Sequence, residues 1–322
     1  MRASKLRLVG HLFIGAILVS HCAVTARAAT PALFDANDND AVANPPGGAQ
    51  PSPTQAGWTG FTQTGVTGVV SGFGTLGVSV IRIQGDAATD DRDRGQLATG
   101  THPLSNLLRD LISEGGAPAT TGKGTVDIVV TGINAGHYLF GTFMHDNTVD
   151  HLLMDIQLSV DSGSSFTLGA DDAFVSTGIN PAKVGSAAFE FTANGTDSVV
   201  FRYVAEGGTI GFPLLDNAFF NGFEIEPITQ LGDFNGVGGV TTADYFLLSD
   251  HLGNQSGATW IGHSGGDINL DGLVNLDDFG KFKALYPGVA AAAEAGVPEP
   301  SCMLLALLSG IAAASVRRKR AV

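Results

Sequence analysis

Residues 187–192, Ala-Ala-Phe-Glu-Phe-Thr, and residues 199–203, Val-Val-Phe-Arg-Tyr, are two short runs rich in aromatic and β-branched side chains. Within the first run, Phe189 and Phe191 alternate with small or polar residues. Successive side chains of a strand point to opposite faces of its sheet, so this period of two places both rings on one face. The stretch therefore predicts β-strands with one buried and one solvated face.

Similar runs recur throughout residues 57–228, and glycine-rich turns separate them. About eight to ten strands at this spacing favour a mainly β fold, a β-sandwich of the jelly-roll kind. One helix is expected to cover an end of the sandwich, because leucines recur at i, i+3, i+4 and i+7 over residues 104–111. Strands and helices do not alternate, which argues against a doubly wound fold. The further runs are residues 78–83, 126–130, 138–144, 152–160, 166–168 and 219–225.

A calcium-binding pattern follows this β-region. Residues 267–278 place oxygen-bearing side chains at positions 1, 3, 5, 9 and 12 of a loop, with Gly272 at position 6, where the chain must turn sharply. Ca²⁺ takes about 6–8 oxygen ligands, and this spacing wraps them around one point. Val274, at position 8, is expected to pack inward. The oxygen-bearing residues are Asp267, Asn269, Asp271, Asn275 and Asp278.

An earlier copy of the pattern occupies residues 233–244. It keeps positions 1, 3, 6, 8, 9 and 12, but position 5 is Val237, whose side chain carries no oxygen. This second site is expected to be degenerate and weaker, or to be completed by water or backbone carbonyls. Each loop leads into a segment with helical apolar patterning, residues 245–252 and residues 279–286.

Two such loop–helix units with Asp at position 12 resemble a type I dockerin, an EF-hand-like calcium module. The resemblance implies a small all-α domain over residues 229–289, stabilised by Ca²⁺, and a cohesin domain as partner. Positions 10 and 11 depart from the small hydroxyl residues that dockerins often use for cohesin recognition, because they are Thr242-Ala243 and Leu276-Asp277. By the resemblance, the ligands are Asp233, Asn235, Thr241 and Asp244 for the degenerate site, and Asp267, Asn269, Asp271, Asn275 and Asp278 for the strong one.

The start of the chain has the features of a signal peptide. Basic residues at positions 2, 5 and 7 precede an apolar stretch over residues 8–20, and Ala26-Arg27-Ala28 supplies the small-x-small pattern of a signal-peptidase site. Residues 1–28 are therefore expected to direct export and to be cleaved after about Ala28. Residues 29–56, rich in Ala, Asn, Asp and Pro, are expected to form an irregular leader.

The end of the chain carries a second targeting pattern. Pro298-Glu299-Pro300 precedes an apolar run over residues 302–316 and four basic residues at 317–320. The run is shorter than the roughly 20 residues of a comfortable membrane span. The order of these features resembles the PEP-CTERM sorting signal of Gram-negative bacteria, which implies a hydrophobic sorting helix over residues 298–322 after a linker at 290–297. An exosortase-type protease would then cut near Pro298, Glu299 and Pro300, after transient anchoring in the inner membrane, and deliver the protein to the cell envelope or extracellular matrix. An ordinary C-terminal membrane anchor is the alternative.

Charge argues against two classes of partner, and the cysteine positions argue against disulfides. Eight of the 17 basic residues lie in the two terminal segments, which leaves nine basic against 31 acidic residues, a net charge of −22, for residues 29–316. Such a surface repels nucleic acid and anionic membranes, so neither is an expected partner. The two cysteines, Cys22 and Cys302, lie in the terminal signals, so no disulfide is expected in the region between them.

Two short pieces of the β-region suggest a ligand class. Gly-Trp58-Thr-Gly-Phe61 and Asn221-Gly-Phe223-Glu-Ile225 resemble secreted galactose-binding-like or malectin-like jelly rolls. This resemblance implies a carbohydrate-binding or adhesive module. The candidate ligand-binding residues are Trp58, within the first piece, and Asp146 and His151, in a separate cluster of His and Asp residues. Core packing is the alternative for Trp58 and Phe223. The cluster that contains Asp146 and His151 is otherwise a polar loop, a metal site or an acid–base pair.

No motif in the chain identifies a catalytic centre. Asp161-Ser162-Gly163 has the form of an aspartic-protease element, but that chemistry needs a second such element and the chain has none. The segment is instead expected to be a hairpin turn. The sequence thus favours a non-enzymatic, calcium-stabilised surface or matrix protein with a carbohydrate-binding or adhesive sandwich. The alternatives are a dockerin-bearing polysaccharide hydrolase, which would hydrolyse O-glycosyl bonds with two carboxylates, and a scaffold subunit recruited by cohesin.

Overall fold

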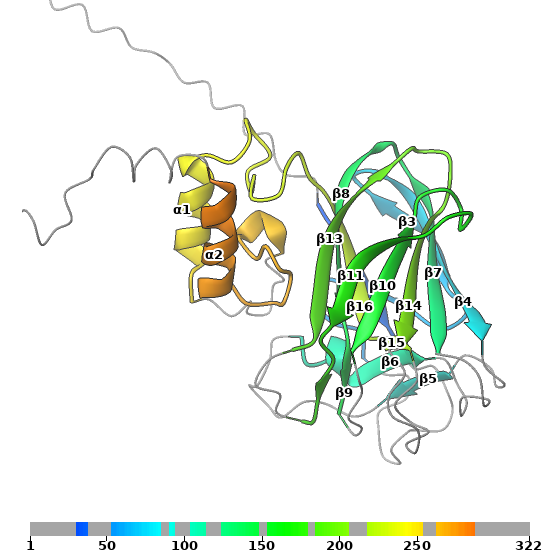
Figure 1. The fold of residues 1–322 in the computed structure, drawn as a ribbon. Helices are drawn as coiled ribbons and strands as arrows, with labels where there is room; N and C mark the ends of the chain where they lie inside the picture. Colours follow the sequence, from blue (N-terminus) through cyan, green and yellow to red (C-terminus); the bar gives the residue numbers. More distant parts are fainter. Residues whose placement is uncertain are drawn as a thin grey trace, which may run out of the picture.

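Two facing, mainly antiparallel sheets dominate the computed structural model, which describes residues 30–37, 53–84, 90–93, 104–113, 124–147, 153–179, 184–205, 218–253 and 262–286. The first sheet has the strand order β13-β8-β16-β1-β2, and the second has the order β11-β10-β14-β7-β4-β3. The prediction of a mainly β chain with a β-sandwich is confirmed (Figure 1). The strands of these sheets are β1 (Ala32–Ala36), β2 (Thr59–Phe61), β3 (Val66–Ser71), β4 (Gly74–Gln84), β7 (Thr125–Ile133), β8 (Gly136–Phe143), β10 (Met154–Ser159), β11 (Thr167–Ala173), β13 (Ser186–Ala193), β14 (Val199–Ala205) and β16 (Gly222–Pro227).

Aromatic side chains join the two sheets into one core. Phe140 of β8 stacks on Phe201 of β14 with ring centroids 3.7 Å apart, and Phe223 of β16 stacks on Phe34 of β1 at 4.8 Å. All four rings are fully buried. Buried aromatic rings contribute large apolar areas, so this cluster supplies much of the driving force that holds the layers together.

Two small sheets close one end of the sandwich. One pairs β9 (His145–Asp146) in parallel with β12 (Ser176–Thr177), and the other has the order β15-β6-β5, from β15 (Phe219–Phe220), β6 (Asp110–Ser113) and β5 (Asp90–Asp93). The turn expected around Asp161-Ser162-Gly163 is confirmed, because β10 and β11 pair antiparallel on either side of it. The Asp161 carboxylate accepts hydrogen bonds from the Ser159 hydroxyl and from the Ser165 backbone N–H, the latter at 3.0 Å. Hydrogen bonds to this carboxylate, first of all the one from Ser159, lower the pKa of Asp161 to about 2. The Asp161 carboxylate therefore stabilises the hairpin turn.

The expected irregular leader over residues 29–56 is wrong for residues 32–36, which form β1. This strand lies inside the first sheet, antiparallel to β16 and parallel to β2. Ala and Asp have low strand propensity, so the local sequence does not predict a strand. Pairing on both sides and the burial of Phe34 against Phe61 and Phe223 override that preference.

The helix expected over residues 104–111 is also wrong. Only Leu107–Arg109 is helical, as the short 3₁₀ helix η1, and the chain then enters strand β6. The buried leucines of this segment pack with Trp58 and Phe143. A turn followed by a strand therefore buries the same leucines that a helix would have buried, and periodicity alone does not separate the two arrangements.

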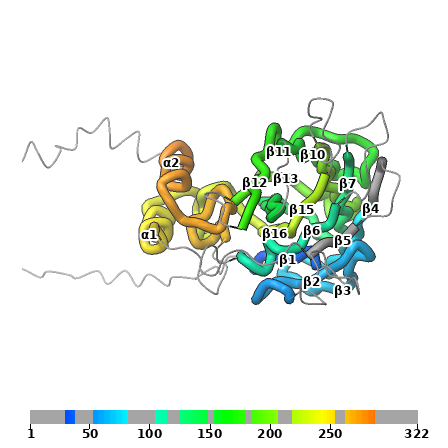
Figure 2. The backbone as a smooth tube through the Cα atoms, turned by 90° about the horizontal axis from the view of Figure 1, so that it is seen from below, coloured from blue at the N-terminus to red at the C-terminus, as the bar shows by residue number. Residues whose placement is uncertain are grey.

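The last described part of the chain is a compact loop–helix unit. Helix α1 (Thr242–His251), the 3₁₀ helix η2 (His263–Gly265) and helix α2 (Leu276–Leu285) surround a separate apolar cluster. The unit lies beside one flank of the sandwich in both views (Figures 1 and 2). Its cluster consists of Phe234, Val240, Leu248, Ile268, Val274 and Phe282.

The segments predicted at the two ends of the chain lie outside the described residues. These are the signal peptide at 1–28 with Ala28, the linker at 290–297, and the sorting signal at 298–322 with Pro298, Glu299 and Pro300. Within the residues that the structure describes, no helix combines the length and apolar character needed to cross a bilayer.

Candidate functional site

The loop over residues 267–278 curls around the carboxylate of Asp267. One oxygen of that carboxylate accepts the Gly272 N–H at 2.8 Å and the other accepts the Asp271 N–H at 3.2 Å. Gly272 has φ +85°, a conformation that glycine adopts without strain, which explains its place at the sharp turn. The loop therefore has the compact wrap that its sequence spacing predicts.

Acidic side chains converge inside this loop. Asp267, Asp271 and Asp278 are all buried. Burial raises the pKa of Asp267 well above its usual value, and the nearby Asp271 and Asp278 carboxylates raise it further. Carboxylates that destabilise one another's charge in a buried loop are a donor set suited to a cation, and hard oxygen donors suit Ca²⁺. The residues present thus fit a calcium ion.

The loop over residues 233–244 has the same wrap with fewer donors. Asp233 accepts the backbone N–H groups of Val237 at 3.0 Å and Gly239 at 3.1 Å. Asp244 accepts the Asn235 N–H at 3.1 Å and the Thr241 N–H at 2.9 Å. Val237 at position 5 is 47% exposed and offers only its backbone carbonyl. The arrangement agrees with a weaker site.

Both helices begin inside the loops. Thr241 and Asp244 form a capping box at the start of α1, and Asn275 and Asp278 form one at the start of α2. Loop positions 9 and 12 therefore also satisfy backbone N–H groups that the first helical turn leaves without partners. Val240 and Val274, at position 8 of each loop, pack inward, as expected for Val274.

A groove separates α2 from the flank of the sandwich. Its sandwich wall is made by β11 and β13, the terminal strands of the two sheets in the described part of the chain. Its other wall is made by α2 and by Asn269 of the second loop. The groove has a volume of about 860 Å³, within the range of small-molecule binding sites. The lining residues used below are Asp171, Asp172, Phe174, Asn269, Asp277 and Lys281.

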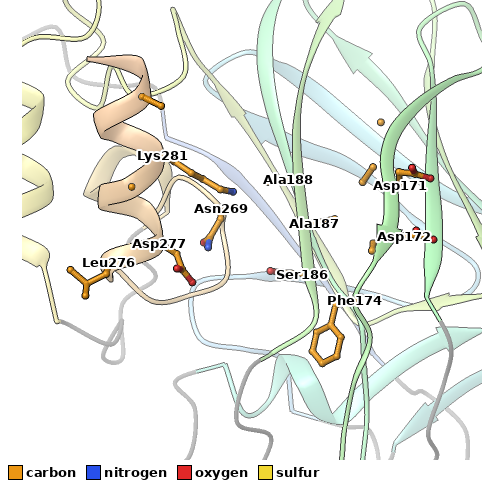
Figure 3. A pocket seen from close by; sticks show the side chains of 15 residues that line it. Asp171, Asp172, Phe174, Ser186, Ala187, Ala188, Asn269, Leu276, Asp277 and Lys281 are labelled. Atoms are coloured by element: carbon orange, nitrogen blue, oxygen red, sulfur yellow. The ribbon is translucent and has the colours of Figure 1, made fainter. Parts of the chain in front are cut away.

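The groove combines polar walls with one exposed ring. Lys281 reaches from α2 towards β13, and the Phe174 ring lies at the lower end of the groove, whereas the Asn269 amide turns back to Asp271 of its own loop (Figure 3). Phe174 is 46% exposed, although large aromatic rings are normally buried. Small residues of β11 and β13, Gly169, Ala187 and Ala188 among them, also line the groove.

Three acidic side chains gather beside this groove. Oxygen atoms of Asp155, Asp171 and Asp172 lie within 4.8 Å of one another. Asp155 Oδ1 also accepts the Asp172 backbone N–H at 3.2 Å, next to an irregularity in the β10–β11 pairing. Asp171 and Asp172 line the groove, but their carboxylates gather with Asp155 over β10, on the side of β11 away from α2 (Figure 3).

The candidate ligand-binding residues lie elsewhere. Trp58 is 7% exposed and packs against Phe143 with ring centroids 6.0 Å apart, and Phe223 is fully buried, so both side chains belong to the interior. Asp146 is buried in β9, and His151 lies outside the described residues. The described side chains of this set do not line the groove.

His145 ties two segments together below the sheets. Its Nδ1 lies 2.7 Å from the Ser176 hydroxyl, and its Nε2 lies 2.6 Å from Asn147 Oδ1. Burial lowers the pKa of His145, so the ring is neutral at pH 7. Both ring nitrogens have buried oxygen partners, an arrangement that suits a structural link between β9 and β12.

Sequence reasoning did not identify the groove residues Asp171, Asp172, Phe174 and Lys281. Two signals were available. The acidic pair Asp171-Asp172 lies just before Phe174, and Asp277 and Lys281 lie four residues apart, on one face of a helix. Neither signal shows that the two elements face each other, because that depends on how the unit docks.

No protein-family model matches this chain, and no curated protein matches it. One similar solved structure is that of the plant peptide RALF23 in complex with FER and LLG2, at 10% identity and a TM-score of 0.33, covering 64% of this chain and 41% of that chain. A second is a family 35 carbohydrate-binding module from Clostridium thermocellum, at 13% identity and a TM-score of 0.23, covering 47% and 90%. A third is CpGH89CBM32-5 from Clostridium perfringens in complex with GalNAc-β-1,3-galactose, at 12% identity and a TM-score of 0.24, covering 47% and 94%. This chain spans less than half the length of the plant chains it matches. Likenesses at these TM-scores carry no ligand or activity over to this chain.

Proposed function

We propose that this chain is an exported, calcium-stabilised protein of the cell surface or extracellular matrix whose sandwich binds carbohydrate. The observation that carries the proposal is the groove between α2 and strands β11 and β13, with its exposed Phe174 ring and its polar walls. A concave site with one apolar platform and a few polar groups is the usual form of a small-molecule site.

The chemistry of the groove selects a neutral saccharide. The C–H face of a sugar ring packs on an aromatic ring, as other apolar surfaces do. The carboxylate of Asp277 would accept hydrogen bonds from sugar hydroxyls, and the Lys281 ammonium would donate them. The strongly acidic region between the terminal signals disfavours anionic polysaccharides and nucleic acids.

Calcium is part of the same proposal. Asp267, Asn269, Asp271, Asn275 and Asp278 would hold one ion strongly, and Asp233, Asn235, Thr241 and Asp244 would hold a second one weakly. Residues 233–286 have a small apolar cluster and no disulfide, so a bound ion would contribute directly to their folding free energy. The ion would serve stability rather than a chemical step.

Export, exosortase-type processing near Pro298-Glu299-Pro300 and a cohesin-like partner remain proposals from the sequence. Leu276 and Asp277, the recognition positions of the dockerin resemblance in the second loop, line the groove. A cohesin-like domain at that face would therefore compete with a saccharide. Intact mass of the protein recovered from the producing cells tests the processing, because loss of residues 1–28 and of the segment beyond about residue 300 is expected.

A glycan array tests the carbohydrate proposal. The purified protein with CaCl₂ is expected to bind a set of neutral glycans, and Phe174→Ala is expected to lose that binding by about tenfold or more. Phe246→Ala is the matched control, because Phe246 is also an exposed aromatic ring, 58% exposed on α1, and does not line the groove. Absence of binding to any saccharide, or equal binding by the two variants, would contradict the assigned site.

A further inference from the structure

The second calcium loop is seated on the face of the first sheet. Leu270, between the proposed ligands Asn269 and Asp271, is fully buried. A Cβ atom built on Gly141 of β8 would lie 3.0 Å from Leu270 Cβ and in closer contact with Leu270 Cδ1. Only a glycine at this position leaves room for the leucine, so the loop tip and the sheet fit together closely.

The backbone of Leu270 is held in an uncommon conformation. Its φ is +53°, in the left-handed region that residues other than Gly, Asn and Asp rarely occupy. The surrounding loop must therefore fix this residue, and the hydrogen bonds that wrap the loop run through its two neighbours, Asn269 and Asp271. The position of the Leu270 side chain depends on how tightly the loop is wrapped.

A second contact fixes the approach to the loop. Glu226 of β16 is buried, and its carboxylate accepts the backbone N–H groups of His263 and Ser264 in η2. His263 in turn accepts the Gly232 N–H on Nε2 at 3.0 Å. The sheet therefore holds the loop–helix unit at η2, just before the loop, and at Leu270, within it.

The same loop forms one wall of the groove. Asn269 is at once a proposed calcium ligand and a lining residue, and α2 begins at Leu276 within the loop. A change in the wrap of the loop would move this wall relative to β11 and β13. A change in loop conformation would therefore alter both the contact of Leu270 with Gly141 and the shape of the groove.

We infer that calcium occupancy of residues 267–278 is coupled to the sandwich through Leu270 and Gly141, and that saccharide binding in the groove is calcium-dependent for this reason. The calcium dependence of saccharide binding rests on the function proposed above. The coupling between the loop and the sandwich can be measured without a saccharide. Anything that binds only the wrapped loop also stabilises the elements that the wrapped loop supports.

Hydrogen–deuterium exchange of the purified protein, with CaCl₂ or with EGTA, tests the coupling. In the wild-type protein, calcium is expected to slow exchange in residues 263–278 and also in residues 136–143 and 222–227 of the sandwich, on the order of tenfold. Leu270→Asn is expected to keep the protection of the loop and lose that of the two strands, because Asn tolerates the left-handed conformation and lacks the apolar side chain. Leu252→Asn, at an exposed leucine that ends α1, is the matched control and should behave as wild type.

A second variant changes the sheet residue of the same contact. Gly141→Ala leaves the loop sequence intact and displaces Leu270, so it should also uncouple the strands from calcium. Protection confined to the loop in the wild-type protein would overturn the coupling while leaving calcium binding intact. No effect of calcium anywhere would overturn both the coupling and the calcium site, whereas a failed glycan array would leave the exchange result standing.

Discussion

Leu270 of the second loop lies directly over Gly141 of strand β8, in a space that exists because residue 141 has no side chain. Gly141 pairs with Glu224 in β16 and with Ala188 in β13, so it is an interior position of its sheet. Glycine weakens a strand interior and often marks a close approach by another part of the protein. Here the approaching group is the tip of a proposed calcium loop, so the loop–helix unit, which has its own apolar cluster, packs directly on the sandwich.

Gly141→Ala is expected to destabilise the protein by about 1–3 kcal/mol, because the added methyl group overpacks the contact with Leu270. The free energy of unfolding from urea titration, followed by circular dichroism, measures this loss. Gly280→Ala is the control, because a Cβ there meets open space within α2 and alanine is a better helix former. That control is expected to gain up to about 1 kcal/mol. Equal effects of the two substitutions would contradict the close fit at Gly141.

Glu226→Gln is expected to stabilise the protein at high pH and to have much less effect at low pH. Burial raises the pKa of Glu226 to about 8, whereas the unfolded value is near 4.5. The folded state therefore holds an extra proton between these values, and the stability contributed by this group falls as pH rises from about 4.5 to 8. The glutamine removes that loss and still offers an acceptor to the His263 and Ser264 N–H groups.

The difference in unfolding free energy between Glu226→Gln and wild type should grow by up to about 4 kcal/mol between pH 5 and pH 8.5. Burial also raises the pKa of Asp35 to about 7 and lowers that of His263 to about 4, but both groups are present in both proteins and cancel in the difference. Asp250→Asn, which removes an exposed carboxylate on α1, is the control and should change the free energy of unfolding only slightly. A pH-independent effect of Glu226→Gln would contradict the assigned burial.

Asp278→Asn is expected to weaken calcium binding by at least about tenfold, because it removes one negative charge and the bidentate capacity at position 12. The amide oxygen retains an acceptor for the start of α2, so the helix should survive. Titration calorimetry with CaCl₂ measures the affinity. Asp277→Asn is the neighbouring control, since Asp277 is exposed and is not a proposed ligand. Comparable losses in both variants would mean that general charge, rather than ligation, attracts the ion.

Val237→Asp is expected to strengthen the first site. It supplies the oxygen that position 5 lacks, and Val237 is half-exposed, so little apolar packing is lost. The measurement is the number of calcium ions bound per chain at a fixed free calcium concentration. The variant should bind one ion more than wild type in the range where the native first loop is unfilled. Unchanged stoichiometry and affinity would show that this loop is not a calcium site.

The sequence predicted those elements whose signal is local. Alternation around Phe189 and Phe191 located β13, and the 161–165 turn followed from its residue types. It did not predict β1, because Ala32–Ala36 becomes a strand only through pairing with β16 and β2. Leucines at helical spacing over residues 104–111 likewise fitted a 3₁₀ turn and a strand equally well.

The calcium loop could be predicted from the sequence and the groove could not, again because only the loop depends on local sequence. Loop spacing is a local property, so the wrap around Asp267 follows from residues 267–278 alone. The groove depends on the docking of α2 beside β11 and β13, which are more than 80 residues away along the chain. No pattern within Thr167–Ala173 or Leu276–Leu285 specifies that docking, and the glycine that permits it, Gly141, lies in a third segment.

The most direct measurement is a pair of glycan arrays with the purified wild-type protein, one in CaCl₂ and one in EGTA. We expect binding to neutral glycans in calcium and loss of the same signals in EGTA. Signals of equal strength on both arrays would contradict the calcium-dependent groove, and a blank array in calcium would contradict carbohydrate binding itself.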